Sequence, residues 1–397
     1  MLQRSWTETS QLTVFHLVQP VEGGVARVVT DLVRAQVAEG FRAVVACPPG
    51  GVLASDAAAA GATVHTWHAG RAPGPRLVTE TLTAARLIRG SSPHVVHAHS
   101  AKAGLAGRLA VRGRLPTVFQ PHAWSFDAVE GRTAELALSW ERYGTRWSTR
   151  TLCVSETERL AGERAGIAAR WTVIRNGIDL RHFGDPDPAH RTARAGLPQL
   201  RHLPADAPLV VCVGRLCRQK GQDILLRAWT RVNATVTGAH LVLVGDGPDR
   251  ERLMRGAPPG VLFAGASRDT RPWLRAADVV VLPSRWEGMA LAPLEAMALG
   301  RPVVVSDVGG ARESLPPGHA AHALVPPEDP EALAVALTTL LTRPELRESL
   351  GRQAQIHTRA TCDVQQTTAA VCGLYRELLD QELPSSPRSM TRKHTKR

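Results

Sequence analysis

Short apolar segments alternate with helix-like segments along most of this chain, and no other feature limits its possible folds as strongly. An apolar run at 12–18 precedes a glycine-containing turn and an amphipathic helical pattern at 25–37. Similar pairs continue to about residue 174, and the cycle restarts at 209. Strands that alternate with helices form parallel sheets with helices on both faces. We therefore predict an α/β protein with two Rossmann-like, doubly wound domains that face each other across a cleft.

The domain organisation follows from length and from one break in this pattern. The 397 residues exceed what one hydrophobic core usually supports. The periodicity dissolves between Phe183 and Pro208, where we place the linker. We assign residues 1–190 to the first domain and 191–363 to the second, with a last helix at 364–383 packing back on the first. Residues 384–397 hold five Arg and Lys and no acid, so we expect a basic, disordered tail.

Charge and cysteine usage limit the partners and the compartment. The formal charge of +12 suits an anionic substrate, an anionic membrane surface or nucleic acid. Because the chain has no recognisable recognition helix, RNP aromatics or zinc-ligand spacing, we do not expect a nucleic-acid partner. Six cysteines without a C-x-x-C pair indicate reduced thiols and the cytoplasm. No uncharged apolar run approaches the roughly 18 residues of a spanning helix, so we expect membrane contact to be peripheral.

The first motif with chemical content is G-R-L-C-R-Q-K-G at 214–221, directly after a buried strand. Ligands of open α/β sheets bind at this carboxyl edge. Arg215 and Lys220 can converge there on one anion, and together they can offset charge on a leaving diphosphate without a metal. A solvated basic loop is the alternative interpretation. A P-loop is excluded because G-x-x-x-x-G-K-[ST] does not occur.

The second motif is the stretch 281–295, which reads as strand, loop and helix. Pro293 suits a first helical turn, whose free N–H groups and dipole can hold an anion. Glu287 and Glu295 would lie about 80° apart if both were helical, which makes a poor facing acid pair. We therefore expect Glu287 on the loop, near sugar hydroxyls, and Glu295 in the first turn, near a ribose. Simple complementarity to the helix dipole is the alternative for Glu295.

These motifs together resemble a known family. G-R-L-x-x-x-K-G with E-x7-E, an early strand before Gly23-Gly24 and the stretch 121–126 around His122 are similar to retaining, GT-B-fold glycosyltransferases of family 4. The resemblance runs from about residue 12 to about residue 375. It implies transfer of a sugar from a nucleoside-diphosphate sugar to a carbohydrate, lipid-linked or small-molecule acceptor, as in polysaccharide or glycolipid biosynthesis.

The resemblance also assigns roles to residues. Arg215 and Lys220 would bind the donor diphosphate, Glu295 the ribose and Glu287 the transferred sugar. His122 would contact the donor sugar or orient the reacting groups, although a core histidine is the alternative. The remaining residues implied at the diphosphate belong to two loops: Gly23, Gly24, Met289, Ala290 and Leu291. Met289 and Ala290 depart from the family, which often has Phe and then Gly or a small polar residue.

The mechanism implied by the resemblance needs no cofactor and no metal. The departing phosphate oxygen accepts the acceptor's proton on the same face of the sugar, and Glu287 stabilises and positions. His97 and His99 lie on one face of a strand, but we expect no nearby partners to complete a metal shell. A nucleotide-sugar 2-epimerase of the same architecture and a non-enzymatic binder of anionic ligands remain alternatives.

Aromatic residues at helical spacing suggest where a membrane could contact the protein. Trp140, Tyr143 and Trp147 recur together with arginines in one helical pattern. Such a face suits a membrane-bound acceptor at the inner surface of the membrane. Packing in the core is the alternative, because aromatic stripes usually serve it.

Overall fold

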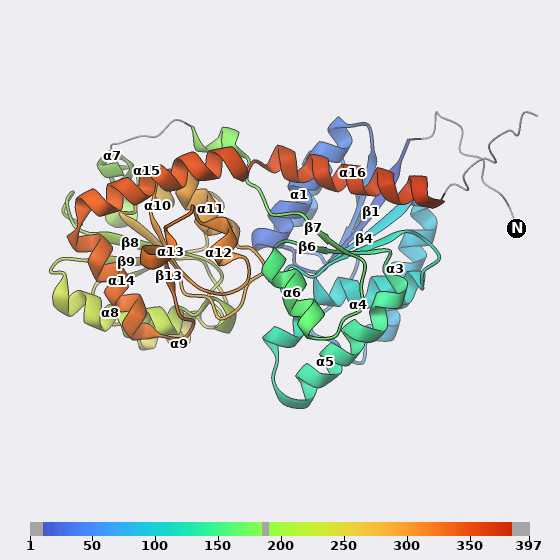
Figure 1. The fold of residues 1–397 in the computed structure, drawn as a ribbon, viewed down its shortest axis with the longest axis horizontal. Helices are drawn as coiled ribbons and strands as arrows, with labels where there is room; N and C mark the ends of the chain where they lie inside the picture. The colour runs from blue at the N-terminus through green and yellow to red at the C-terminus, as the bar shows by residue number, and fades with distance from the viewer. Residues whose placement is uncertain (1–10, 185–189, 383–397) are drawn as a thin grey trace, which may run out of the picture.

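The structure is a computed structural model that describes residues 11–184 and 190–382. It contains two α/β domains that lie side by side (Figure 1). The polar amino terminus at 1–10, part of the expected linker at 185–189 and the basic tail at 384–397 lie outside the described residues. The predicted fold class, two Rossmann-like halves, is confirmed.

In the described part of the first domain, seven parallel strands form a sheet in the order β3-β2-β1-β4-β5-β6-β7. These strands are β1 (Thr13–Val18), β2 (Arg42–Cys47), β3 (Thr63–Thr66), β4 (Val95–His99), β5 (Thr117–Gln120), β6 (Arg150–Cys153) and β7 (Trp171–Val173). The helices are α1 (Gly23–Ala38), α2 (Leu53–Ala59), α3 (Leu77–Ser91), α4 (Ser100–Val111), α5 (Gly131–Gly144) and α6 (Glu156–Arg164), with short 3-10 turns η1 (Ser125–Ala128), η2 (Thr145–Trp147) and η3 (Leu180–Phe183).

In the described part of the second domain, six parallel strands form a sheet in the order β10-β9-β8-β11-β12-β13. These strands are β8 (Leu209–Val213), β9 (His240–Val244), β10 (Val261–Gly265), β11 (Val279–Leu282), β12 (Val303–Ser306) and β13 (Leu324–Val325). The helices are α7 (His190–Ala195), α8 (Gln222–Thr235), α9 (Arg250–Arg255), α10 (Arg271–Ala276), α11 (Leu291–Ala298), α12 (Ala311–Ser314), α13 (Ala320–Ala323), α14 (Pro330–Thr342) and α15 (Pro344–Thr361), with 3-10 turns η4 (Pro198–Leu200) and η5 (Arg218–Lys220). The last helix, α16 (Val364–Glu382), follows the second domain in the sequence.

The central strands explain why these sequences fold as parallel sheets. All residues of β1 and of β11 are buried, and both strands are rich in Val and Leu. Strands covered by helices on both faces need such continuous apolar runs. The strand order reverses between β1 and β4 and again between β8 and β11. Ligands of open α/β sheets bind at such reversal points, so each domain has one natural binding edge.

Helix α16 connects the two domains. After α15 crosses the second domain, α16 runs along the first domain and packs against α1 (Figure 1). Arg376 on α16 pairs with Glu39 at 2.6 Å, and Arg150 on β6 pairs with Glu377 at 2.9 Å. The backbone of Ile178 bridges to that of Asp363, where the chain returns to the first domain. The expected boundaries at residues 190 and 363 stay a prediction.

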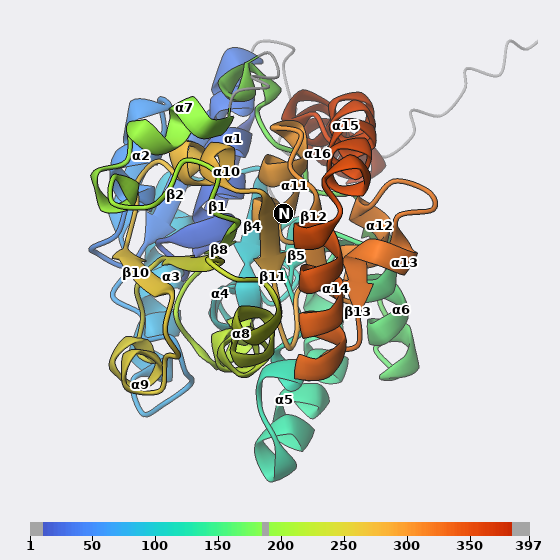
Figure 2. The same ribbon diagram turned by 90° about the vertical axis from the view of Figure 1, so that its left-hand side faces the viewer.

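Two helix ends differ from the sequence-based expectation. Helix α1 begins at Gly23, so both glycines belong to its first turn and not to the preceding loop. Gly23 has φ +74°, a backbone conformation that glycine adopts without strain. The aromatic helix ends at Gly144 and continues only as the 3-10 turn η2. Figure 2 shows α5 projecting from the body of the first domain. Among the described residues, no helix combines the length and the apolar character that crossing a membrane requires.

Candidate active site between the two domains

The loop after β8 carries the predicted cations Arg215 and Lys220. Lys220 is the last residue of η5, and Gly221 follows with φ +66°. A Cβ on Gly221 would stand 2.0 Å from the carbonyl oxygen of Pro283, at the end of β11. Only glycine therefore lets the loop after β8 lie directly on the loop after β11. This close approach brings the two sequence motifs together, while the Arg215 side chain remains exposed.

Lys220 and Glu287 form an ion pair at the centre of this contact. The Lys220 Nζ atom lies 2.5 Å from Oε1 of Glu287, and the Ser284 hydroxyl donates to the same oxygen at 2.7 Å. The two charged side chains are 20% and 10% exposed, so water screens the pair only in part. Glu287 lies on the loop, as predicted. The residues predicted for diphosphate and for sugar are thus direct neighbours.

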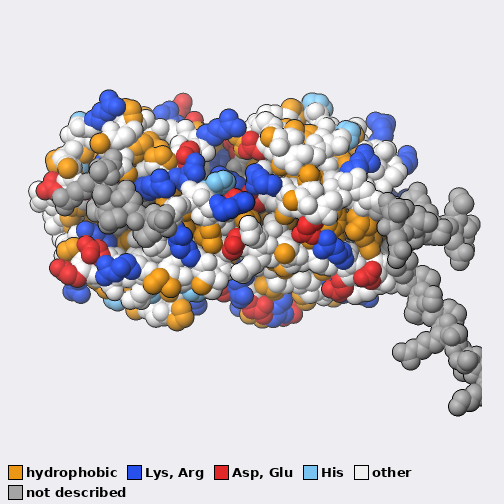
Figure 3. Space-filling model, turned by 90° about the horizontal axis from the view of Figure 1, so that it is seen from above, with side chains coloured by type: hydrophobic (Ala, Val, Ile, Leu, Met, Phe, Trp, Pro, Cys, Tyr) orange, Lys and Arg blue, Asp and Glu red, His pale blue; other side chains and the backbone are white. Residues whose placement is uncertain are grey.

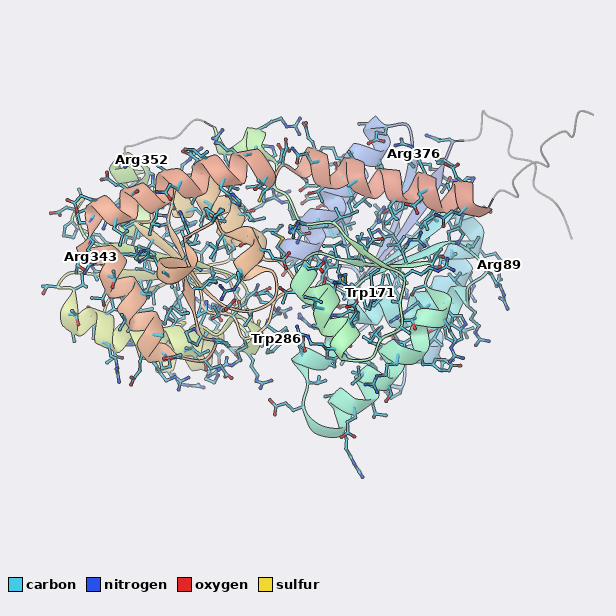
Figure 4. The ribbon with its side chains drawn as sticks, viewed as in Figure 1. Arg89, Trp171, Trp286, Arg343, Arg352 and Arg376 are labelled. Atoms are coloured by element: carbon cyan, nitrogen blue, oxygen red, sulfur yellow. The ribbon has the colours of Figure 1, made fainter. Side chains whose placement is uncertain are left out.

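The backbone after Glu287 is held by neighbouring loops of both domains. The Gly310 N–H donates to the Gly288 carbonyl at 2.5 Å. From the first domain, the Asn176 side-chain amide donates to the Met289 carbonyl at 2.8 Å. Met289 is buried, at 5% exposure, and Trp286 on the same loop lies near the junction of the domains (Figure 4). These bonds fix the path of the loop into helix α11.

The amino terminus of α11 is available to a ligand. The helix begins at Leu291 after Ala290, and none of the described side chains caps it. Free N–H groups and the helix dipole attract an anion at such an end. A small cavity lies beside it, lined by Glu287, Ala290, Pro293 and neighbouring residues of β12 and α12. Binding of an anion at this helix end stays a prediction.

Glu295 lies just past the first helical turn, in which the sequence predicts it. Because α11 already begins at Leu291, Glu295 is its fifth residue, and the first turn contains no acidic residue. Pro293 is tolerated as third residue because N–H groups in the first turn have no intrahelical acceptor. Burial raises the pKa of Glu295, while the positive charge of Arg27 on α1 acts in the opposite direction. Glu295 therefore faces the first domain, and its role at a ribose stays a prediction.

The glycines of α1 lie opposite the start of α11. A Cβ on Gly24 would be 3.8 Å from Cγ of Leu291, in ordinary van der Waals contact. A Cβ on Gly23 would meet nothing within 4 Å. The first turn of α1 and the first turn of α11 thus face each other across the domain junction, with open space at Gly23. A ligand at the α11 terminus would lie beside both glycines.

His122 follows β5 in an unusual backbone conformation. His122 has φ +58° and Ala123 has φ +126°, both in a region that L-residues rarely adopt. The Glu158 carboxylate holds this turn, accepting the Ala123 N–H and the Val154 N–H at 2.7 Å each. Residues held in such conformations cost about 1–3 kcal/mol each and cluster at functional sites. The strained backbone therefore marks His122 as a candidate residue of a functional site.

The turn at His122 touches the loop of Glu287. A Cβ on Gly288 would stand 2.9 Å from the carbonyl carbon of His122 and 2.8 Å from Cγ2 of Val154. The Ser155 hydroxyl also reaches the Gly288 carbonyl at 3.5 Å. The structure therefore brings His122, Glu287 and Lys220 to one place, from three different strand ends.

Two known families match this chain. Residues 207–343 match the family model described as "Glycosyl transferases group 1", and residues 22–182 match "Glycosyltransferase Family 4". Together these ranges contain both motifs, the two glycines and His122. The chain is a member of the GT-B glycosyltransferases.

Individual members of this glycosyltransferase family show what the chain is similar to. A lipopolysaccharide core biosynthesis mannosyltransferase, LpcC of Rhizobium leguminosarum bv. viciae, is 36% identical over 52% of this chain and 60% of the relative. An Escherichia coli UDP-Gal:alpha-D-GlcNAc-diphosphoundecaprenol alpha-1,3-galactosyltransferase is 30% identical over 57% and 60%. The matched region thus spans about three fifths of the length of these relatives.

Solved glycosyltransferase structures share the fold. Alr3699/HepE of Anabaena, in complex with UDP and glucose, superposes with a TM-score of 0.79, at 21% identity, over 92% of this chain and 100% of that chain. At this identity the likeness concerns the fold. It agrees with the two parallel sheets of this chain.

Sequence reasoning missed several residues of the site. Partial burial lowers the pKa of Arg71, and the nearby charge of Arg215 lowers it further, so these two cations lie near each other from opposite domains. No motif surrounds Arg71. Glu158 stands three residues after Ser155, a pattern typical of a helix capping box. That pattern could have identified the position, but the Glu158 carboxylate binds Ala123 and Val154 instead.

A second, open cavity lies beside the loop after β8. It has a volume of about 460 Å³ and is lined by Val129, Glu130, Thr133 and Arg218. The first three residues precede or begin α5 in the first domain, and Arg218 belongs to η5 in the second. Arg218 and Glu130 form an ion pair across it. Figure 3 views the molecule from the side of α16, away from α5, and on that face basic side chains gather near the middle of the molecule.

The expectation that His97 and His99 lack a nearby third ligand is wrong. His16 of β1 stands beside both, and ligand atoms of the three lie within 4.8 Å of one another. The parallel pairing of β1 with β4 places His16 directly opposite His97, a register that the sequence does not show. The three side chains are fully buried.

The predicted aromatic face exists and is partly exposed. Ring centroids of Trp140, Tyr143 and Trp147 lie 5.3–6.2 Å apart, and the Arg146 guanidinium stands 3.7 Å from the Tyr143 ring centre. Tyr143 is 46% exposed and Leu136, on the same helix, 72% exposed. Trp140 and Trp147 are half-buried, so the three rings form a cluster across α5 and η2 of which Tyr143 is the exposed member.

Proposed function

We propose that this protein transfers a sugar from a nucleoside-diphosphate sugar to a glycan acceptor with retention of anomeric configuration. The observation that carries the proposal is the Lys220–Glu287 pair beside the uncapped start of α11. A cation and free N–H groups suit the diphosphate, and a carboxylate suits sugar hydroxyls. The glycines of α1 leave room for this ligand on the opposite side.

The donor diphosphate would bind among positive groups of the second domain, opposite Gly23 and Gly24 of the first. Lys220 and Arg215 would contact its oxygens from the second domain, and the N–H groups at Met289, Ala290 and Leu291 would receive it at the helix end. Fixed positive groups stabilise charge that develops on a leaving group because they need no reorganisation during the reaction. Glu295, deeper in α11, would accept hydrogen bonds from the ribose hydroxyls.

Retention follows if both substrates react on one face of the sugar. The bond between the anomeric carbon and the diphosphate oxygen breaks, and the acceptor oxygen bonds to the same carbon from the same side. The acceptor's proton passes to the departing diphosphate oxygen. Glu287 would position the sugar, and His122 would form a hydrogen bond with a hydroxyl of the donor sugar or of the acceptor.

We assign no cofactor and no metal to this reaction. The nucleoside-diphosphate sugar is a substrate, and Arg215, Lys220 and the α11 terminus supply the positive charge that a divalent cation supplies in other transferases. The positive groups that lie beside the proposed diphosphate site support this assignment.

The acceptor and the place of action are proposed from the relatives and from helix α5. One relative acts in lipopolysaccharide core biosynthesis and another on a diphosphoundecaprenol-linked sugar, as their names state. We propose polysaccharide or lipid-linked glycan biosynthesis at the cytoplasmic face of the membrane. The open cavity between α5 and η5 would receive the acceptor. The aromatic cluster on α5 would contact anionic lipid peripherally.

A donor screen tests the proposed function. The purified protein is incubated separately with uridine, guanosine and adenosine diphosphate sugars, and mass spectrometry follows release of the nucleoside diphosphate. We expect slow release from one donor class and faster release with a suitable acceptor, with the product's anomeric configuration retained by NMR. Conversion of the donor to its 2-epimer would support the epimerase instead. Failure to bind or turn over any nucleotide sugar would contradict the proposal.

A further inference from the structure

We propose that Gln36, His16 and His99 form a directed hydrogen-bond chain that holds His122 as a single tautomer, with its proton on Nε2. In this arrangement Nδ1 of His122 carries a lone pair that can accept a hydrogen bond from a hydroxyl of a bound sugar. The three supporting residues are positioning residues, because they act only through His122. The inference rests on the proposed function of His122 and adds a role for Gln36, His16 and His99.

The chain is continuous from helix α1 to the candidate site. Oε1 of Gln36 lies 2.9 Å from Nε2 of His16, and Nδ1 of His16 lies 3.0 Å from Nε2 of His99. Nδ1 of His99 then lies 3.1 Å from Nε2 of His122. These are all ordinary hydrogen-bond distances. Elements α1, β1, β4 and the loop after β5 each contribute one residue.

Burial closes the chain to water along most of its length. Gln36, His16 and His99 are each 0% exposed, and only His122 at the end reaches partial exposure. The His99 ring stacks on the rings of His16 and His122, at centroid distances of 5.3 and 5.4 Å. Each ring is therefore fixed in orientation as well as in position. Rotation of one ring would leave buried nitrogen atoms unpaired, which is costly.

The chemistry of the end group sets the direction of the chain. The oxygen of the Gln36 amide can only accept, so Nε2 of His16 must donate to it. A neutral imidazole has one N–H, so Nδ1 of His16 must accept from Nε2 of His99. By the same reasoning, Nδ1 of His99 accepts from Nε2 of His122. One acceptor at the buried end thus determines the tautomer at the exposed end.

All three imidazoles are neutral near pH 7, which this reasoning requires. Burial lowers the pKa of His16 to about 4 and that of His122 to about 3, and it lowers the pKa of His99 well below its ordinary value. The neighbouring histidines oppose protonation of His99 further. A proton added to His16 or His99 would reverse or break one of the hydrogen bonds of the chain, and a proton on Nδ1 of His122 would remove its free lone pair.

The free end of the chain belongs to a residue of the candidate site. Among the described residues, Nδ1 of His122 makes no hydrogen bond. The His122 backbone touches Gly288, the residue that follows Glu287. A sugar hydroxyl held by Glu287 could donate to this nitrogen. The fixed tautomer would favour a hydroxyl donor over a group that can only accept, and it would need no rearrangement when substrate binds.

A metal ion is the competing explanation for this cluster. His16, His97 and His99 could offer three ligand atoms, as noted above. However, both ring nitrogens of His16 and both of His99 already have hydrogen-bond partners. Nδ1 of His97 contacts the Tyr375 hydroxyl at 2.6 Å, outside the chain. A bound metal would have to displace the His16–His99 bond, so the two explanations exclude each other.

The first test is spectroscopic and needs no substrate. The full chain is labelled with ¹⁵N-histidine, and the His122 resonances are identified by their loss in His122→Gln. We expect the Nε2–H tautomer of His122 in the wild type. Gln36→Glu keeps an accepting oxygen and should keep this tautomer, whereas Gln36→Leu removes the acceptor and should give a mixture. Thr30→Val removes a buried hydrogen bond to the Ala26 carbonyl on the same helix α1, outside the chain, and should leave His122 unchanged.

The second test is kinetic and separates positioning from stability. Gln36→Leu should lower kcat in proportion to the remaining fraction of the correct tautomer, by about tenfold if one molecule in ten retains it, with little change in donor KM. Gln36→Glu should restore kcat. An Nδ1–H tautomer of His122 in the wild type, an unchanged His122 in folded Gln36→Leu, or stoichiometric metal in the purified protein would each overturn the proposal. Because the NMR result needs no turnover, it stands or falls separately from the proposed function.

Discussion

Nζ of Lys220 lies 2.5 Å from Oε1 of Glu287, so residues 67 positions apart in the sequence form one ion pair at the domain junction. The pair depends on Gly221, whose missing side chain lets the loops after β8 and β11 meet. In the proposed function the lysine serves the diphosphate and the carboxylate serves the sugar. The two groups also attract each other, so a ligand must compete with Glu287 for the ammonium.

This competition predicts opposite effects of two substitutions on binding of a nucleoside diphosphate without sugar. Glu287→Gln should leave the affinity unchanged or raise it, because Lys220 loses its competing partner. Lys220→Met should lower the affinity by about tenfold to a hundredfold, since it removes one charge-assisted contact. Calorimetric titration with the diphosphate of the active donor measures both. An equal loss of affinity in the two variants would show that the pair is only a structural support.

Gly221→Ala should destabilise the second domain. The new Cβ would clash with the Pro283 carbonyl at 2.0 Å and would sit at φ +66°, so we expect a loss of at least about 2 kcal/mol. Gly318→Ala is the matched control, because Gly318 has φ +84° but open space around its Cα, and it should cost about 1 kcal/mol. Urea unfolding measures both variants. Similar losses would mean that the loop contact can relax.

Glu158 should make the stability depend on pH. Burial raises the pKa of Glu158 to about 7, above its ordinary value. A carboxyl group whose pKa is higher in the folded than in the unfolded protein stabilises the fold fully at a pH below the unfolded pKa. This stabilisation is lost as the pH rises through the folded pKa, here about 7. The wild type should therefore lose about 3 kcal/mol relative to Glu158→Gln between pH 4.5 and 8, from the size of the shift.

Urea unfolding of both proteins at several pH values in this window measures the difference. Glu163→Gln, which removes a half-exposed carboxylate from the same helix α6, is the control. Its free energy of unfolding should change with pH in the same way as that of the wild type. If the free energy of unfolding of Glu158→Gln ran parallel to that of the wild type between pH 4.5 and 8, the two N–H bonds would keep the Glu158 carboxylate ionised over this whole range.

Helix α5 should mediate binding to anionic vesicles. Leu136 is 72% exposed on this helix, so Leu136→Glu adds a negative charge without disturbing the core. We expect weaker flotation with vesicles that contain anionic lipid. Ile356→Glu is the matched control, because Ile356 is 71% exposed on α15 in the other domain. Flotation that falls equally in both variants would point to net charge, and flotation unaffected by Leu136→Glu would remove α5 from the membrane contact.

The sequence predicts the fold and the two motif loops because both depend on local patterns. Buried strands such as β11 read as apolar runs, and Gly221 marks the tight turn beside Lys220. The sequence does not fix the first residue of α11, because Pro293 is acceptable at more than one position of a first helical turn. The helix begins at Leu291, so Glu295 lies just past the turn in which the sequence predicts it.

Contacts that depend on register between distant segments could not be predicted. His16 lies opposite His97 only because β1 pairs with β4, 81 residues later, and the chain from Gln36 to His122 exists only in the folded protein. Arg71 approaches Arg215 from the other domain. Such residues have no motif around them, so composition and spacing carry no signal.

Release of nucleoside diphosphate from the active donor tests the central claim most directly. Lys220→Ala and Glu287→Ala should each lower kcat/KM at least about a hundredfold, because each removes a preorganised group at the reacting diphosphate or sugar. Arg231→Ala removes an exposed ion pair with Glu331 on the same domain and should retain wild-type activity. Wild-type rates in both Lys220→Ala and Glu287→Ala would contradict the assignment of the site.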